Sequence, residues 1–177
     1  MTAVKVPWRT AIIVMGVSGA GKSTIGTRLA KALHSIYLEG DSFHPPRNVA
    51  KMHAGTPLTD EDRLPWLKAI AARIDEARKS GESLVVTCSA LKRSYRDILA
   101  DGHSDVGFVF LKGSKDLIAE RLEHRKGHFM PPQLLDSQFA ALQEPTADEP
   151  AIVVPVDATP DDIAESIVGK FMMDARP

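Results

Sequence analysis

The stretch best suited to chemistry is GVSGAGKST at residues 16–24, where glycines alternate with small residues ahead of a lysine and two hydroxyls. It has the spacing G-x-x-x-x-G-K-S/T, follows the apolar run AIIVM at 11–15 and precedes a segment with helical spacing. Glycines let successive backbone N–H groups turn toward one anion, and a following helix points the positive end of its dipole there. The pattern predicts a loop that holds the phosphates of a nucleoside triphosphate, rather than an ordinary glycine-rich turn.

Each position of this loop has an expected role. Lys22 supplies a cation for the β- and γ-phosphates, and the Ser23 hydroxyl is a candidate ligand for Mg²⁺. The expected phosphate-binding residues are Gly16, Val17, Ser18, Gly19, Ala20, Gly21, Lys22, Ser23 and Thr24. The sequence has no Asn-Lys-x-Asp motif for guanine selection, and the run LVVTC at 84–88 lacks the terminal Asp usual in hydrolytic relatives. Among the proteins that share this loop, these two absences argue against the GTPases and against the hydrolytic relatives.

A second cluster follows the run IYLE at 36–39 and begins Gly40-Asp41. Asp41 is expected at the carboxyl end of a strand, on the same side of the sheet as the glycine-rich loop. A carboxylate there can orient and deprotonate an attacking hydroxyl, and a neighbouring acid can support Mg²⁺ through water. Donors and cations crowd the next positions, namely His44, Arg47, Asn48 and Lys51. The alternative is an Asp that only caps a helix.

The stretch TPLTDEDRLPWL at 56–67 places four charges ahead of an expected helix that starts at Pro65. Thr59 or Asp60 is a natural N-cap, and acidic residues suit a first helical turn. Arg63 fits capping poorly, because a cation near a helix N-terminus is unfavourable, so it is a candidate for pairing with an anionic substrate. Trp66 is expected in the core rather than as a stacking platform.

Two further stretches carry clustered cations. In SALKRSYR at 89–96, Lys92 is expected to face the same cleft as the glycine-rich loop, while Arg93 fits a solvated helix face. In RLEHRKGHF at 121–129, Arg121 and Arg125 are four apart and are expected on one helical face, where like charges repel unless an anion lies between them. Such a pair can close on a phosphoryl group and stabilise transition-state charge.

The residues Lys126, Gly127 and His128 then suit a mobile lid. The alternative for this stretch is a basic surface helix balanced by Glu120 and Glu123.

The segments that must position these residues alternate between short apolar runs and stretches with helical spacing. Strands are expected at 11–15, 36–39, 84–88, 107–111 and 152–156, and helices at 24–33, 65–77, 115–124, 131–142 and 161–172. Continuously apolar short runs fit strands covered on both faces, and strands that alternate with helices imply right-handed crossovers. The expected fold is α/β, with three layers: a parallel sheet between two layers of helices. At 177 residues with no linker, the chain is expected to be one domain with functional insertions at 41–64 and 124–132.

Composition sets the remaining expectations. The formal net charge is −1, which argues against a general nucleic-acid binder, and no stretch approaches the roughly 20 apolar residues of a membrane span. The single Cys88 cannot form an intramolecular disulfide and favours a reducing compartment, so the chain is expected in the cytoplasm. The six histidines show no metal-ligand spacing, so no structural zinc is expected.

Several stretches together resemble gluconate kinase (gluconokinase), of the small-molecule kinase group that includes shikimate and nucleoside monophosphate kinases. The matching stretches run in family order from about 10 to 145: GVSGAGKST, EGDSFHPPRNVAKMHAGTPLTDEDRLPWL, CSALKRSYRDIL, FVFLKGS, RLEHRKGHFM and LQEP. The glycine-rich loop is shared by many families. The stretches GD-x-x-HP, PL-x-D-x-DR and RKGHF are far more specific.

The resemblance implies ATP-dependent phosphorylation of D-gluconate on its terminal (6-) hydroxyl, giving 6-phosphogluconate for the pentose phosphate or Entner–Doudoroff routes. It also implies Mg²⁺, a P-loop kinase fold with a five-stranded parallel sheet, a helical lid over about 121–132, and commonly a homodimer. By position, the resemblance implies catalytic roles for Lys22, Asp41 and Arg125, and ATP binding by 16–24 and Arg121. The residues expected to hold gluconate are Asp41, His44, Arg47, Arg63 and Lys92.

Two other functions stay open from the sequence alone. One is another kinase of the same fold, acting on shikimate or a different sugar acid. The other is a nucleotide-dependent sensor that keeps the loop but has lost catalysis, which the presence of Asp41 and both arginines opposes.

Overall fold

The computed structural model describes residues 6–125 and 132–174, and the centre of that part is a sheet of five parallel strands. The strands are β1 (Ala11–Met15), β2 (Ile36–Glu39), β3 (Leu84–Thr87), β4 (Val106–Lys112) and β5 (Ala151–Pro155). Their order is β2-β3-β1-β4-β5, so β1, which leads into the glycine-rich loop, is central. All five strands lie within one residue of the expected ranges, and the three-layer α/β prediction is confirmed.

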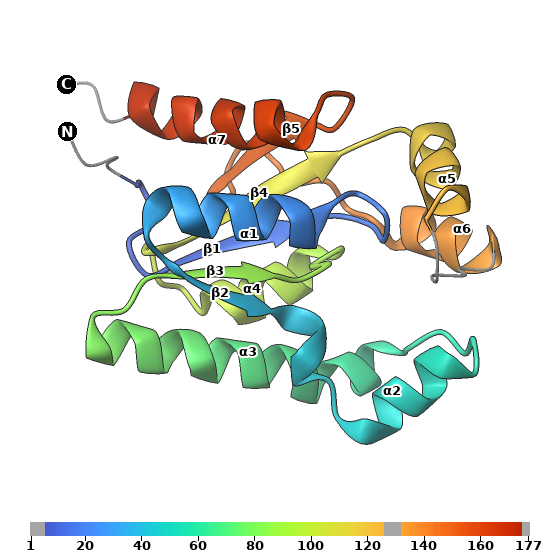
Figure 1. Ribbon diagram of the computed structural model, residues 1–177. Coiled ribbons are helices and arrows are strands. Elements are labelled where there is room, and N and C mark those ends of the chain that lie inside the picture. Colours follow the sequence, from blue (N-terminus) through green and yellow to red (C-terminus); the bar gives the residue numbers. More distant parts are fainter. Residues whose placement is uncertain (1–5, 126–131, 175–177) are drawn as a thin grey trace.

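Helices cover both faces of the sheet. Helices α1 (Lys22–Leu33) and α7 (Pro160–Asp174) pack on one face, and α3 (Asp60–Ser80) and α4 (Arg93–Ala100) on the other. The remaining helices lie beyond the carboxyl ends of the strands (Figure 1): η1 (Gly40–Phe43), α2 (Pro46–His53), α5 (Lys115–Glu123) and α6 (Pro132–Ala141). The carboxyl edge of the sheet is therefore the end of the molecule that carries extra structure.

The central strand explains why the core has two halves. Ile12 and Val14 of β1 pack in the cluster that includes α1 and α7, whereas Ile13 and Met15 pack in the cluster with α3 and α4. Because successive strand residues point to opposite faces, a strand covered on both sides must be apolar throughout. Burying each such side chain contributes roughly 1.5–3 kcal/mol, which makes this strand a rigid support for the loop that follows it.

The expected start of the helix at Pro65 was wrong. Helix α3 begins at Asp60, with Thr59 as its N-cap. The Thr59 hydroxyl accepts a hydrogen bond from the Asp62 N–H at 3.1 Å, and the Asp62 carboxylate accepts one from the Thr59 N–H at 3.0 Å. This reciprocal capping box fixes the helix start five residues earlier, and Pro65 lies inside the helix.

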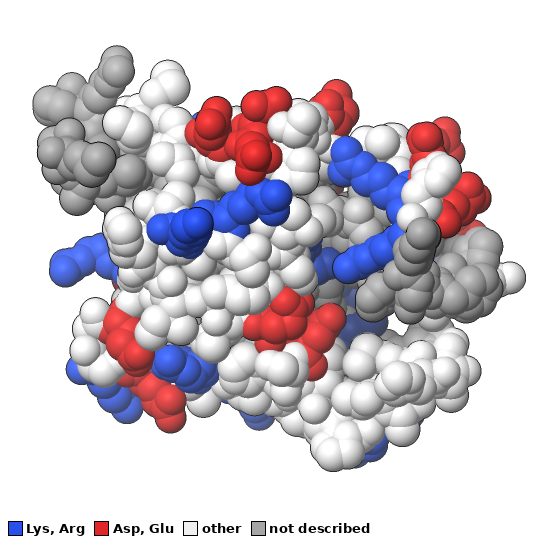
Figure 2. All heavy atoms as spheres, viewed as in Figure 1, with Lys and Arg blue, Asp and Glu red and all other residues white. Residues whose placement is uncertain are grey.

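Charge is mixed over the face of the molecule seen in Figure 2, where Lys and Arg side chains lie among Asp and Glu. This agrees with the near-zero net charge and leaves anion binding to local groups. Over residues 6–125 and 132–174, every helix is too short or too polar to cross a membrane.

Candidate active site

The glycine-rich loop joins β1 to α1 at the carboxyl edge of the sheet. Gly21 is the N-cap of α1 with φ +97°, a conformation that side-chain-bearing residues rarely adopt, so Lys22 can begin the helix. The Lys22 ammonium donates hydrogen bonds to the carbonyl oxygens of Gly16 and Val17, both at 3.0 Å. Burial lowers the pKa of Lys22, and the nearby charges of Asp41 and Glu39 oppose that lowering. The lysine is thus held inside the loop, as the phosphate-binding prediction requires.

A second carboxylate, which was not among the site residues named from the sequence, lies beside Ser23. The Ser23 hydroxyl lies 2.9 Å from each carboxylate oxygen of Glu39, the last residue of β2. The hydroxyl of Thr87 in β3 donates to the same carboxylate at 3.1 Å, and the Tyr37 hydroxyl also donates to it. Three hydroxyls from three elements therefore converge on one acid next to the phosphate loop. The position of Glu39 at a strand end beside Asp41 is the sequence signal that pointed to it.

The turn that carries Asp41 is fixed by a close approach of two backbones. A Cβ at Gly40 would lie 1.7 Å from the Thr87 carbonyl oxygen, so only glycine lets the chain pass β3 here. The Gly40 N–H donates to the Thr87 hydroxyl at 3.1 Å, and the Gly40 carbonyl accepts from the Trp66 indole N–H at 2.8 Å. These contacts hold η1 in place, and with it the carboxylate of Asp41.

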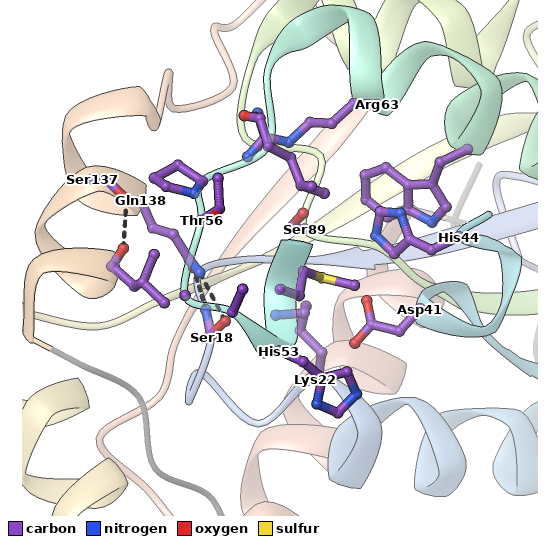
Figure 3. Close-up of a pocket in the computed structure, with 17 residues that line it drawn as sticks. Ser18, Lys22, Asp41, His44, His53, Thr56, Arg63, Ser89, Ser137 and Gln138 are labelled. Carbon is purple, nitrogen blue, oxygen red and sulfur yellow. Dashed lines mark hydrogen bonds between the residues drawn. The ribbon is translucent and has the colours of Figure 1, made fainter. Parts of the chain in front are cut away.

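A pocket of about 510 Å³ opens where these elements meet. It brings together side chains from the glycine-rich loop, from η1 and from the segments around them (Figure 3): Ser18, Lys22, Asp41, His44, Arg63 and Ser89. Residues 52–58, at the end of α2 and directly after it, line one part of the wall, and α6 lines another. Five of the residues expected from the sequence thus share one pocket: Ser18, Lys22, Asp41, His44 and Arg63.

Trp66 and His44 form part of this wall together. The Trp66 side chain is 2% exposed, which confirms that it belongs to the core. The imidazole of His44 stacks on the indole with ring centroids 4.1 Å apart and an interplanar angle of 17°. One face of the indole is therefore covered by His44.

Arg63 is held at the pocket by its own neighbours. Its guanidinium donates to the Leu58 carbonyl at 2.6 Å and to the Tyr95 hydroxyl at 3.3 Å. These two acceptors use only part of the donor set of a guanidinium, which carries five N–H groups. Arg63, whose charge did not fit a role in helix capping, is therefore held at the pocket wall.

Two expected substrate-binding residues are not brought to this pocket. Arg47 lies on the exposed side of α2 and is not part of the pocket wall. The Lys92 ammonium donates to both carboxylate oxygens of Asp60, at 2.9 and 3.2 Å, and does not line the pocket either. Lys92 is the N-cap of α4, where it meets the start of α3, so the strand end contributes Ser89 to the pocket instead.

The two arginines expected on one helical face are separated by the end of the helix. Helix α5 ends at Glu123, so Arg125 lies beyond it and the shared face predicted from their spacing does not form. The Arg121 guanidinium donates to the carbonyl of Val156, just after β5. Arg125 is exposed, and its positive charge adds to the lowering of the Lys22 pKa, for which burial is the largest cause. Residues 126–128, expected to form a mobile lid, lie outside the described residues.

Gln138 of α6 is a contact that sequence reasoning missed. Its amide oxygen accepts from the backbone N–H of Ser18 at 2.7 Å, and its amide nitrogen donates to the Ser18 hydroxyl at 2.9 Å. Because the two residues are 120 positions apart, no local pattern indicates the pair. The contact joins α6 to the middle of the phosphate loop.

Comparison with known proteins identifies relatives of this chain. Residues 12–145 match a protein-family profile described as "AAA domain". The chain is 46% identical over 142 residues to the thermoresistant gluconokinase of Escherichia coli, covering 80% of this chain and 81% of the relative. It is 48% identical over 160 residues to the gluconokinase of Gluconobacter oxydans, covering 90% of each.

A solved structure extends the likeness to three dimensions. The crystal structure of a gluconokinase from Sinorhizobium meliloti superposes with a TM-score of 0.87 at 44% sequence identity, covering 95% of this chain and 94% of that one. At these levels of identity and coverage, the chain belongs to the gluconokinase family.

Proposed function

We propose that this chain transfers the terminal phosphoryl group of ATP to the 6-hydroxyl of D-gluconate, giving 6-phospho-D-gluconate and ADP. The observation that carries the proposal is the single pocket shared by the phosphate loop, the carboxylate of Asp41 and the guanidinium of Arg63. The relatives named as gluconokinases support the identity of the acceptor.

The residues of the pocket divide the chemistry between them. The oxygen of the acceptor hydroxyl forms a bond to the γ-phosphorus, and the bond from that phosphorus to the bridging oxygen of ADP breaks. Asp41 accepts the proton that the hydroxyl loses. Lys22 and the loop N–H groups bind the phosphate oxygens, where negative charge is concentrated in the transition state. Arg125, which is exposed, adds positive charge when it reaches the transferring group.

The acceptor pocket fits a small polyhydroxy acid better than a nucleotide. The guanidinium of Arg63 matches a carboxylate, since its planar fork can donate two parallel hydrogen bonds. A nucleobase would need an aromatic or apolar slot, and the face of Trp66 that could offer one is covered by His44. Asp41, His44 and Arg63 all belong to segment 41–64, which we assign to acceptor binding within a single kinase domain.

The donor set beside the loop fits Mg²⁺. Hard cations such as Mg²⁺ prefer oxygen ligands, and Ser23 with the carboxylate of Glu39 provides them. We assign Ser23 as the ligand and Glu39 as the acid that orients it or holds bound water. When bound, the ion neutralises charge on the β- and γ-phosphates.

Replacing Glu39 by Gln is expected to raise the free Mg²⁺ concentration needed for half-maximal activity by about tenfold, the lower end of typical effects for residues that support a metal ligand. The amide keeps the shape but loses the negative charge, so the maximal rate at saturating Mg²⁺ should change less. Activity titrated with Mg²⁺ at fixed ATP measures this. Glu76→Gln, on the exposed side of α3, is the matched control. An unchanged Mg²⁺ dependence in Glu39→Gln would remove Glu39 from the metal site.

The same proposal includes a homodimer that works in the cytoplasm and supplies the pentose phosphate route, with a lid around residues 121–132. The family resemblance supports the homodimer, the route and the lid, and the single cysteine supports a reducing compartment.

The test of the function is ADP release with ATP and Mg²⁺ against D-gluconate, shikimate, AMP, CMP and related aldonates. We expect selective turnover of D-gluconate and a product phosphorylated at O6 by ³¹P NMR. Turnover of another acceptor would show kinase activity but would change the assigned substrate. No turnover with any of them would favour a nucleotide sensor.

A further inference from the structure

A buried amide contacts one residue of the pocket wall. The side chain of Asn48 in α2 is fully buried, at 0% exposure. Its amide nitrogen lies 2.8 Å from the backbone carbonyl of Asp62 and 3.2 Å from Nδ1 of His44. The residue therefore joins α2, α3 and the imidazole on the pocket wall.

The orientation of this amide follows from the partners it has. A backbone carbonyl can only accept, so the NH₂ group of Asn48 must face Asp62. A flipped amide would place two carbonyl oxygens against each other. The same nitrogen carries a second proton, which it donates in a hydrogen bond to His44. Among the described residues the amide oxygen of Asn48 has no hydrogen-bond partner. The side chain therefore acts through the two hydrogen bonds that its amide nitrogen donates.

The donor at Asn48 fixes the tautomer of His44. An amide nitrogen has no lone pair to offer, so Nδ1 of His44 must be the acceptor and cannot carry a proton. A neutral imidazole with a bare Nδ1 carries its proton on Nε2. Protonation of Nδ1 would set one N–H against another. With Nδ1 turned to Asn48 and one ring face on Trp66, any hydrogen bond from the ring to a pocket occupant goes through Nε2.

We propose that Asn48 is a positioning residue that keeps His44 neutral and protonated on Nε2, so that His44 donates one hydrogen bond to an acceptor hydroxyl. The identity of that hydroxyl rests on the proposed function; the tautomer does not. The ionised carboxylate of Asp41, which lines the same pocket, can only accept hydrogen bonds, whereas Nε2–H can only donate one. A sugar hydroxyl can donate to the first and accept from the second. Asp41 and His44 together therefore favour a hydroxyl over a carboxylate between them. The carboxylate of the substrate then binds to Arg63.

The charges around His44 agree with a neutral ring. Burial has the largest effect and lowers the pKa of His44; Arg63 of α3 lowers it further, while Asp41 of η1 opposes both. Lys22 of α1 and His53 of α2 line the same pocket. Because the pKa in the folded chain is below the ordinary value, the ring stays neutral to lower pH than a free histidine does.

The direct test is long-range ¹H–¹⁵N NMR of the ¹⁵N-histidine-labelled chain without acceptor, with His44 assigned from its loss in His44→Gln. We expect Nδ1 of His44 to show the shift of an unprotonated nitrogen and Nε2 that of an N–H at pH 7.5. A proton on Nδ1, or a cationic ring at that pH, would overturn the proposal. Because no acceptor or turnover is needed, this result is independent of whether gluconate is the substrate.

Kinetics with the acceptor found in the panel then test whether Asn48 acts through His44. Asn48→Leu removes the donor at similar volume, and we expect the acceptor KM to rise about tenfold, the effect of one hydrogen bond, with the KM for ATP unchanged. In a His44→Gln background the same change should have about twofold effect or less, since coupled residues are not additive. Equal effects in both backgrounds would mean that Asn48 only supports the fold.

Asn48→Asp provides a signature that a purely structural role does not predict. Its carboxylate accepts a hydrogen bond, so it should move the proton of the neutral ring to Nδ1 and raise the pKa of His44. At alkaline pH Nε2 would then lack its proton and the acceptor KM should rise. As the pH falls through the raised pKa, Nε2–H returns and the KM should recover. An acceptor KM in Asn48→Asp that depends on pH as in the unchanged chain would contradict the proposal.

Discussion

Lys22→Ala is expected to lower kcat/KM by about a thousandfold or more, the scale seen when a group that stabilises transition-state charge is removed from a buried site. The ammonium lies inside the loop, 3.0 Å from the carbonyls of Gly16 and Val17, in the pocket that Asp41 also lines. No other described lysine lines that pocket. The loss should appear in kcat as well as in the KM for ATP, because the charge on the phosphate oxygens is concentrated during transfer.

The fold should tolerate this change. Position 22 is the first residue of α1, and alanine is a good helix former, so the thermal unfolding midpoint should move little. Lys31→Ala, at the exposed end of the same helix, is the matched control and should keep full activity. Near-normal turnover in Lys22→Ala with its fold intact would exclude this lysine, and with it the loop, from the mechanism.

Asp41→Asn is expected to lower kcat by about 10²- to 10⁴-fold, the range for loss of a general base. The amide keeps the size and hydrogen-bonding shape of the carboxylate but cannot take the proton of the attacking hydroxyl. The affinity for ATP should change far less, because the phosphates are held by the loop and Lys22. Steady-state kinetics with both substrates varied, together with equilibrium binding of ATP, separate the two effects.

Asp97→Asn, on the exposed side of α4, is the matched control for a lost carboxylate. If kcat in Asp41→Asn stayed within about twofold of the unchanged chain while the acceptor KM rose, Asp41 would position the hydroxyl without accepting its proton. If both constants were unchanged, Asp41 would have no part in the reaction.

Much of the fold could be predicted because its signals are local. A strand buried on both faces, such as β1, must be apolar at every position, and this shows in the sequence at once. The start of α3 was harder: Pro65 is a frequent first helical residue, but the capping box of Thr59 and Asp62 begins the helix earlier. Both signals are present in the sequence, and only the packed structure decides which one takes effect.

Part of the candidate site could likewise be predicted from the sequence, and part could not. The loop at 16–24, Asp41, His44 and Arg63 follow strand ends or lie in a segment of unusual composition, so spacing and residue type were enough to name them as candidates. Arg47, Lys92 and the pairing of Arg121 with Arg125 were not placed as expected, because spacing along a helix does not say where that helix ends or which side faces a cleft. Lys92, for example, is drawn to Asp60 at the start of α3.

The sequence by itself determined the parallel α/β fold, the phosphate loop and the acid that faces it, since each depends on residues close together in the chain. Only the tertiary structure decided the contacts between distant segments: Glu39 with Ser23 and Thr87, Gln138 with Ser18, and Asn48 with Asp62. The physical reason is that a hydrogen bond depends on distance and direction in space. Parallel strands and their crossovers bring segments together that the order of the chain keeps apart.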